Sequence, residues 1–207
     1  MARDPENLSA AHATPTAELV VIYDEWSDTY DDDVRAWGYE VPRRLAQRLV
    51  ALRPPASAPL VFDAGCGTGQ SGLALAAAGF GRIVGGDVST ASLERASGHG
   101  VHEQLTVADL TATLPWEADT FDAAVSAGVF TYLPDPLASA RELVRVTSGP
   151  VIFSQRTDLW ESRDMEDVVD TLRADGHAVD VTEPLPYLPG HPEYGDSIRV
   201  REVMITG

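Results

Sequence analysis

The chain has 207 residues, a hydrophobic content of 44% and a formal net charge of −17 at pH 7. This length suits a single domain with a sizeable core, and the hydrophobic content is that of an ordinary globular protein. The strong negative charge argues against a phosphate-binding surface, so we expect no nucleic acid partner. The single cysteine, Cys66, is consistent with a reducing compartment, and no run of about 18 apolar residues occurs. We therefore expect a soluble, cytoplasmic protein with no membrane partner.

The N-terminal part of the chain divides into two segments. Residues 1–16 are small and polar and are expected to form a flexible tail. Residues 17–59 are expected to form a helical lid and a linker, in which Tyr23, Trp26 and Tyr30 recur at helical spacing. These aromatic residues either pack a helix against the sheet or cover a ligand site.

The stretch 60–69 carries the clearest motif of the core, which is expected to span residues 60–207. An apolar run at 60–62 is typical of a buried parallel strand, and Gly65, Gly67 and Gly69 follow it. A strand that continues through alternate glycines into a helix brings backbone amides close to a ligand. The motif therefore predicts a binding site at the end of this first strand.

Two cofactor classes use such a loop. The segment from Gly67 to Gly72 fits the pattern G-x-G-x-x-G of dinucleotide sites, with Asp87 at a distance suited to a ribose. However, Asp63 at the mouth of the loop would repel a pyrophosphate and would suit a ligand that carries an ammonium and a sulfonium. The motif Asp63-Ala-Gly65-Cys-Gly67-Thr-Gly69 resembles the first motif of the class I S-adenosylmethionine (SAM) methyltransferases. The resemblance implies SAM as the cofactor, bound by these residues together with Ala64.

The next two strands are expected at 83–87 and 103–107. Asp87 ends the first of them, where its carboxylate can accept both hydroxyls of a ribose, with Val88 beside it. After the second, the resemblance implies that Asp109 accepts a hydrogen bond from the adenine amino group while Leu110 packs on the ring. From the residues alone, Asp109 could equally be a turn residue.

The fourth strand, expected at 121–126, ends where group transfer should occur. Ligands of open α/β sheets lie beyond the carboxyl ends of the strands. Ala127 and Gly128 would therefore approach the methionine part of SAM, while Phe130 and Tyr132 either face the acceptor or pack under the next helix.

The C-terminal part predicts how the sheet ends. Strands are expected at 150–154, 177–181 and 197–206, the last two joined by a loop at 184–195 that is too proline-rich for a strand or helix. The predicted fold is thus an α/β, Rossmann-like, seven-stranded and mostly parallel sheet with a C-terminal antiparallel hairpin and an N-terminal helical lid. A dinucleotide fold would instead continue with a second βαβ half.

Three N-terminal motifs carry a second resemblance. Tyr23-Asp-Glu-Trp26, Tyr30-Asp-Asp-Asp33 and Trp37-Gly-Tyr39-Glu-Val-Pro42 are similar to motifs of the methyltransferase-like proteins of the Williams–Beuren region. This likeness favours the lid and implies that Tyr23, Trp26 and Tyr30 lie at the cofactor.

Methyl transfer from SAM needs a nucleophile held in line with the methyl carbon rather than a catalytic triad. The five histidines show no ligand spacing, so no metal is expected. Tyr132 and His191 are candidate catalytic residues by location alone. The expected function is methylation of a small organic acceptor, for example in natural-product metabolism. Two alternatives stay open: a non-methylating reaction such as a cyclisation, and a non-catalytic SAM-binding regulator.

Overall fold

The computed structural model describes residues 30–193, 195 and 197–207 of the protein. The predicted tail at 1–16 and the part of the predicted lid at 17–29 lie outside the described residues.

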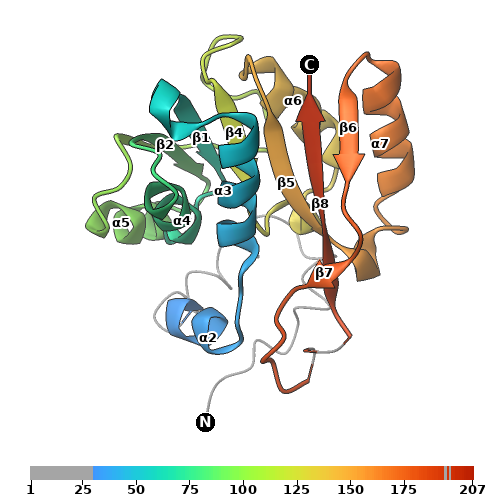
Figure 1. Ribbon diagram of the computed structural model, residues 1–207, viewed down its shortest axis with the longest axis horizontal. Helices are drawn as coiled ribbons and strands as arrows, with labels where there is room; N and C mark the ends of the chain where they lie inside the picture. The colour runs from blue at the N-terminus through green and yellow to red at the C-terminus, as the bar shows by residue number, and fades with distance from the viewer. Residues whose placement is uncertain (1–29, 194, 196) are drawn as a thin grey trace.

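The described residues form one mixed sheet with the strand order β3-β2-β1-β4-β5-β8-β6, and β7 pairs with β8 (Figure 1). The strands are β1 (Leu60–Ala64), β2 (Arg82–Asp87), β3 (Gln104–Val107), β4 (Ala123–Ser126), β5 (Val151–Arg156), β6 (Ala178–Val181), β7 (Leu185–Pro186) and β8 (Arg199–Thr206). Strands β1 to β5 pair in parallel, whereas β8 is antiparallel to β5, β6 and β7. Because β1 pairs with both β2 and β4, the strand order reverses beside β1, and open α/β sheets bind ligands at such a point.

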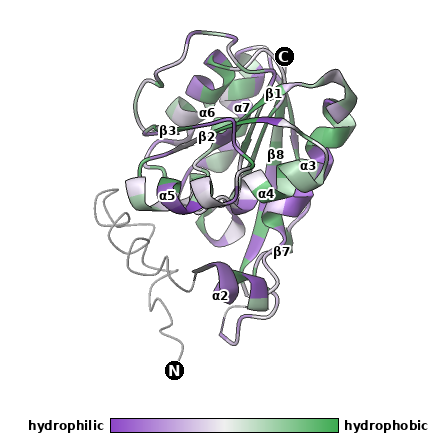
Figure 2. Cartoon of the chain, turned by 90° about the vertical axis from the view of Figure 1, so that its left-hand side faces the viewer, coloured by the Kyte–Doolittle hydropathy of each residue, from purple (hydrophilic) through white to green (hydrophobic). Residues whose placement is uncertain are grey.

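Helices cover both faces of this sheet (Figure 2). The α-helices are α2 (Tyr30–Ala36), α3 (Val41–Leu52), α4 (Gln70–Ala77), α5 (Thr90–Gly98), α6 (Pro136–Arg145) and α7 (Met165–Ala174), with short 3-10 turns η2 (Pro55–Ser57), η3 (Phe130–Tyr132) and η4 (Thr157–Leu159). Helices α6 and α7 pack on one face and α3 and α4 on the other, while α5 contacts β2 and β3. Helix α2 lies beyond the sheet, at the same end as β7 (Figure 1).

Alternation along the buried strands produces the two cores. Successive side chains of a strand point to opposite faces, so Val61 packs toward α3 and α4 while Phe62 packs toward α6 and α7. Ile83 and Val84 in β2, and Ile152 and Phe153 in β5, divide in the same way. This is why the strands show continuous apolar runs in the sequence.

Local signals fix where the helices begin. The Ser89 hydroxyl accepts a 3.0 Å hydrogen bond from the Ser92 amide and is the N-cap of α5. Asp135 caps α6 in the same manner through the Ala138 amide.

Helix α3 is held against β8 by two arginines that pair with a buried glutamate. Glu202 in β8 has no exposed surface and accepts a 2.7 Å hydrogen bond from Nε of Arg44 and another from Nε of Arg48. Leu45 and Leu49 on the same helix are also fully buried. Residues 41–52 therefore belong to the core layer and not to a lid, which corrects the division at residue 60.

The predicted architecture is confirmed, with one local difference. A parallel sheet does end in the antiparallel pair β6 and β8. The proline-rich loop between them nevertheless contains a two-residue strand, β7, which pairs with β8 and lies off the main strand order. Proline has no amide hydrogen, so Pro186 is compatible with a strand only at such an edge.

Candidate functional site

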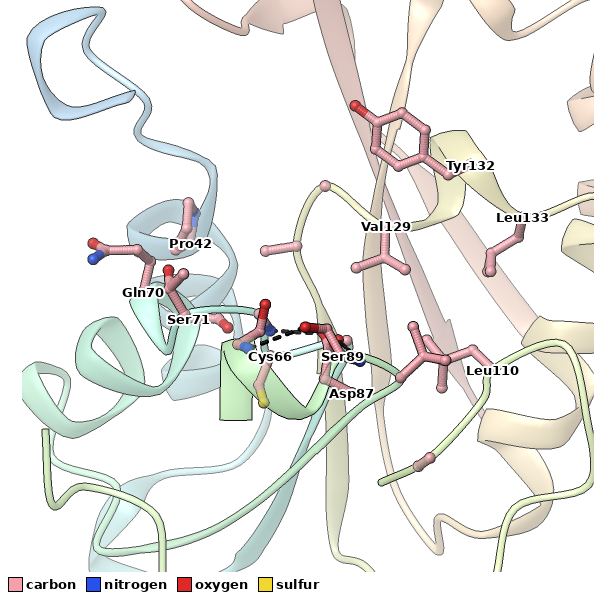
Figure 3. Close-up of a pocket in the computed structure, with 18 of the residues that line it drawn as sticks. Pro42, Cys66, Gln70, Ser71, Asp87, Ser89, Leu110, Val129, Tyr132 and Leu133 are labelled. Atoms are coloured by element: carbon pink, nitrogen blue, oxygen red, sulfur yellow. Dashed lines mark hydrogen bonds between the residues drawn. The ribbon is translucent and has the colours of Figure 1, made fainter. Parts of the chain in front are cut away.

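A cavity lies at the carboxyl ends of β1, β2 and β4, and Figure 3 shows many of the side chains that line it. Its walls come from the glycine loop after β1, the segments after β2, β3 and β4, the start of α3 and the loop after β7. The lining residues are Tyr39, Pro42, Gly65, Cys66, Gly67, Thr68, Gln70, Ser71, Asp87, Val88, Ser89, Ser92, Ala108, Asp109, Leu110, Thr111, Ala127, Gly128, Val129, Tyr132, Leu133 and Tyr187. The cavity thus includes eight of the residues predicted to bind the cofactor, namely Gly65, Gly67, Asp87, Val88, Asp109, Leu110, Ala127 and Gly128.

The backbone conformation and the close contacts of the glycine loop leave no space for side chains at some of its positions. Gly65 and Gly67 have φ angles of 71° and 51°, in the left-handed region that favours glycine. A Cβ on Gly65 would lie 2.5 Å from Cγ2 of Val129, which follows β4. The Gly65 amide donates a 2.7 Å hydrogen bond to the carbonyl of Gly86, so the loop is tied to β2. Glycine at position 65 therefore allows the loop to approach the end of β4.

Asp87 is held in place by backbone amides. Its carboxylate accepts hydrogen bonds of 2.8 Å from the Gly67 amide and 2.9 Å from the Ser89 amide, drawn as dashed lines in Figure 3. A carboxylate offers about four acceptor positions, so it can accept two more hydrogen bonds from a ligand in the cavity. Burial raises the pKa of Asp87, and the charge of Asp63 adds to that effect although the amides oppose it.

Asp109 forms a turn with the residues after it. One carboxylate oxygen accepts hydrogen bonds of 2.8 Å from the Thr111 amide and 2.7 Å from its hydroxyl. Such a turn was one of the two interpretations of Asp109. Its position on the cavity wall keeps the other interpretation, a ligand contact, open as well.

Three tyrosines from separate parts of the chain form the end of the cavity nearest β4. The rings of Tyr39 and Tyr187 meet edge to face with their centroids 5.4 Å apart. A Cβ on Gly128 would lie 2.5 Å from the hydroxyl oxygen of Tyr39, so this glycine makes room for the ring. Tyr132, in η3, lines the same cavity.

A buried arginine lies behind these tyrosines. Arg156 has no exposed surface, and its guanidinium carbon lies 5.9 Å from the ring centroid of Tyr187. Nη2 and Nε of Arg156 donate hydrogen bonds of 2.6 and 3.0 Å to the Asp158 carboxylate. Burial alone would lower the pKa of Arg156, but the bond to Asp158 and the nearby tyrosines hold it above its usual value. Gln155 and Arg156 are both fully buried because β5 extends to Arg156.

Three residues of the glycine motif do not line the cavity. Asp63 is completely buried, and its Oδ2 lies 3.0 Å from Nε2 of His102. The expectation that Asp63 stands at the mouth of the loop is therefore wrong, because its side chain faces inward from β1. Ala64 is fully buried in the core on the α6 side. Gly69, with φ of 99°, is the N-cap of α4 and faces Ala96 of α5.

The candidate catalytic residues separate in the structure. Tyr132 lines the cavity, whereas His191 does not. His191 is buried, and its ring packs edge-on against Trp37 with a centroid distance of 4.4 Å. Its Nδ1 accepts a 3.1 Å hydrogen bond from the Glu193 amide. His191 therefore holds the loop after β7 against the segment between α2 and α3, which corrects its proposed catalytic role.

The other aromatic residues predicted at the site either pack in the core or lie outside the residues that the structure describes. Phe130 is fully buried and stacks on Phe153, with ring centroids 3.8 Å apart, so it packs into the core and does not face the acceptor. Tyr23 and Trp26 lie outside the described residues, and of Tyr30 only the backbone, at the start of α2, is described.

Two features of the site were missed by sequence reasoning. Pro42 opens α3 and also lines the cavity, although its position at a helix start gave no sign of that. His102 meets Asp63 beneath the glycine loop, although the two residues are 39 positions apart. The contact between His102 and Asp63 joins distant segments, and a single sequence contains no information about such contacts.

Comparison with known proteins agrees with this geometry. Residues 62–152 match the family model described as "Methyltransferase domain". The solved structure of the cyclase SpnF superposes with a TM-score of 0.71 at 17% identity, over 93% of this chain and 97% of that one. Magnesium protoporphyrin IX methyltransferase from Synechocystis PCC 6803, solved with bound SAH (S-adenosylhomocysteine), gives a TM-score of 0.66 at 18% identity, over 93% of this chain and 100% of that one.

The fold is that of a SAM-dependent methyltransferase. SAM is the cofactor of this fold, and the residues here fit it: Asp87 keeps free acceptor positions beside a loop that side chains would fill. An S-adenosylmethionine-dependent methyltransferase from Mesorhizobium loti shares the methyltransferase fold with a TM-score of 0.61 at 20% identity, over 78% of this chain and 96% of that one.

A curated relative matches part of the sequence. The probable 18S rRNA (guanine-N(7))-methyltransferase of Dictyostelium discoideum is 30% identical over 116 residues. This match covers 51% of the chain and 40% of that protein, so the chain spans less than half the length of this relative.

Among the described residues, no helix has the length and apolar character needed to cross a membrane.

Proposed function

We propose that the protein transfers a methyl group from SAM to a small organic acceptor. The observation that carries this proposal is the single cavity that joins Asp87 and the glycine loop to Tyr39, Tyr132 and Tyr187. The proposed cofactor site and an aromatic surface therefore share one cavity at the end of β4, and methyl transfer requires that arrangement.

In this proposal the cofactor lies along the carboxyl edge of β1, β2 and β4. Asp87 accepts hydrogen bonds from the ribose hydroxyls, while Asp109 and Leu110 contact the adenine. Ala127 and Gly128 hold the methionine part against the glycine loop. The likeness of the N-terminal motifs to the Williams–Beuren region proteins supports a lid over this site, of which α2 is the described part.

SAM, when bound, supplies a methyl group on a positively charged sulfur with a good leaving group. The chain then has to orient the acceptor and exclude water. Tyr39 and Tyr187 form a wall against which a flat acceptor can pack, and the ring of Tyr132 lines the same cavity.

The lining chemistry favours an acceptor without phosphate groups. Among the described residues, the cavity wall contains no lysine or arginine, and it contains the acidic residues Asp87 and Asp109. Phosphate recognition usually depends on arginine. The chain also carries a net charge of −17, so RNA, which the Dictyostelium relative is named for, is the less favoured acceptor.

A cyclisation with bound SAM is the second candidate, because the cyclase SpnF has the same fold. Incubation of the purified protein with extract and methyl-labelled SAM separates the candidates. We expect label in a small, ribonuclease-resistant product, and none with Asp87→Ala. Label in RNA would mean that the acceptor is RNA and not a small molecule. A product that forms only with SAM but carries no label would favour cyclisation.

A further inference from the structure

Three potential metal ligands meet beneath the glycine loop. Asp63 comes from the end of β1, Cys66 from the loop and His102 from the segment before β3. One ligand atom of each lies within 4.8 Å of the others, and Nε2 of His102 is 3.0 Å from Oδ2 of Asp63. The side chains of His102 and Asp63 are 1% and 0% exposed, so the group is shielded from solvent.

Two polar atoms of this group have no hydrogen-bond partner among the described residues. They are Oδ1 of Asp63 and Nδ1 of His102, and both are inaccessible to solvent. Leaving a buried carboxylate oxygen unpaired is costly, so a bound ion or a water is the usual explanation for one. The unpaired oxygen belongs to a residue that already faces the other two ligands.

Two glycines make room for the group. A Cβ on Gly72 in α4 would lie 2.4 Å from Nε2 of His102, and a Cβ on Gly85 in β2 would lie 3.0 Å from Sγ of Cys66. Neither glycine has a positive φ angle, so the backbone does not require glycine at these positions. A side chain at Gly72 would meet the imidazole, and one at Gly85 would meet Leu105 as well as the thiol and the imidazole, so both glycines leave space for the group.

We propose that Asp63, Cys66 and His102 form a buried site for a divalent, zinc-like cation. Thiolate, imidazole and carboxylate are ordinary zinc ligands, and their charges of −1, 0 and −1 neutralise a divalent ion. A neutral complex removes the cost of an isolated carboxylate in the interior. In Figure 3 the sulfur of Cys66 points to the opposite side of the loop from Tyr132, so this site lies behind the cofactor cavity.

The cation stabilises the glycine loop on β1 and β2. Without it, burial and then the charges of Asp63 and Asp87 raise the pKa of the Cys66 thiol, so the thiol keeps its proton. Binding of the metal displaces that proton. The proposal does not depend on the identity of the methyl acceptor or on turnover.

Titration of the chelator-treated, full-length protein with Co²⁺ tests the site. Cys66 is the only cysteine in the chain, so a thiolate-to-cobalt charge-transfer band can arise from this site alone. We expect the band to saturate at one Co²⁺ per chain and to disappear when Zn²⁺ is added. Cys66→Ser should abolish it, and His102→Gln should weaken Co²⁺ binding at least tenfold. His177→Gln is the matched control, because His177 precedes β6 at the opposite edge of the sheet from β2 and β3. This variant should bind Co²⁺ as the parent protein does.

Absence of the band in the folded parent protein would overturn the proposal, and would mean that water fills the group. Unchanged Co²⁺ affinity in a folded His102→Gln variant would overturn it as well. Circular dichroism establishes whether each variant folds. If a variant does not fold, the titration of the parent protein alone decides.

Discussion

The hydroxyl of Thr68 in the glycine loop donates a 2.7 Å hydrogen bond to the carboxylate of Asp31 in α2. This bond links the helix at the rim to the loop that would hold SAM. We expect Asp31→Ala to weaken SAM binding about fivefold, because one hydrogen bond to a charged group contributes roughly 1 kcal/mol at a partly exposed position. Isothermal titration calorimetry with SAH measures the change.

The same link predicts that α2 becomes more protected when the cofactor binds. Hydrogen exchange at residues 30–39 should slow on addition of SAH in the parent protein and in Asp32→Ala, a matched control whose carboxylate pairs with Arg35 on the same exposed surface. In Asp31→Ala the slowing should be smaller. Equal exchange with and without SAH in the parent would mean that α2 is a fixed part of the core.

Asp87→Ala should weaken SAM binding by about 2–4 kcal/mol, roughly 30- to 1,000-fold, because two hydrogen bonds to a carboxylate are lost. The loss should be accompanied by a looser glycine loop, since the Gly67 and Ser89 amides lose their acceptor as well. Calorimetry on a variant of unchanged circular dichroism tests this prediction. An affinity equal to that of the parent would remove Asp87 from the cofactor site.

The pH dependence of SAM binding should report on Asp87. Because burial raises its pKa, the carboxylate gains a proton at a higher pH than an ordinary aspartate does. As the pH is lowered, affinity should therefore begin to fall at a higher pH than the ordinary aspartate pKa of about 4 would predict. For the empty protein the sign is opposite: the folded pKa exceeds the unfolded one, so the contribution of Asp87 to stability decreases as the pH rises. A flat affinity profile in the parent, matching that of Asp87→Ala, would contradict this.

Tyr132→Ala should lower turnover at least tenfold, about 1.4 kcal/mol in the barrier, while SAM affinity barely changes. Tyr132→Phe separates the two roles of the side chain, because it keeps the ring and removes the phenol oxygen. The hydroxyl of Tyr132 is buried, so if the ring alone contacts the acceptor, the phenylalanine variant should keep its turnover. A loss of SAM affinity would instead place Tyr132 at the cofactor.

The ion cluster between α3 and β8 should contribute strongly to stability. Removing both Arg44 and Arg48 leaves the fully buried Glu202 unpaired, which should lower the free energy of unfolding by about 3 kcal/mol. Arg43→Ala is the control, because its pair with Glu40 is exposed and should contribute less than about 1 kcal/mol. Urea unfolding measures both, and a double variant as stable as the control would contradict the assignment.

The fold could be predicted because its signals are local. Apolar runs around Phe62 and Val84 mark buried strands, and the spacing from the glycine loop to Asp87 follows from one βαβ unit. The side chain of Asp63 was misplaced because the motif places this residue near the end of β1 but does not say which way its side chain points. That direction depends on His102, which arrives from a distant segment. His191 was misjudged for the same reason, since its contact is with Trp37 at the other end of the chain.

A crystal structure with SAH bound tests the central claim most directly. The account predicts the ribose hydroxyls within hydrogen-bond distance of the Asp87 carboxylate, the adenine beside Leu110, and the sulfur next to Gly128 and facing Tyr132. SAH bound elsewhere, or bound in this cavity with its sulfur turned away from the three tyrosines, would contradict it.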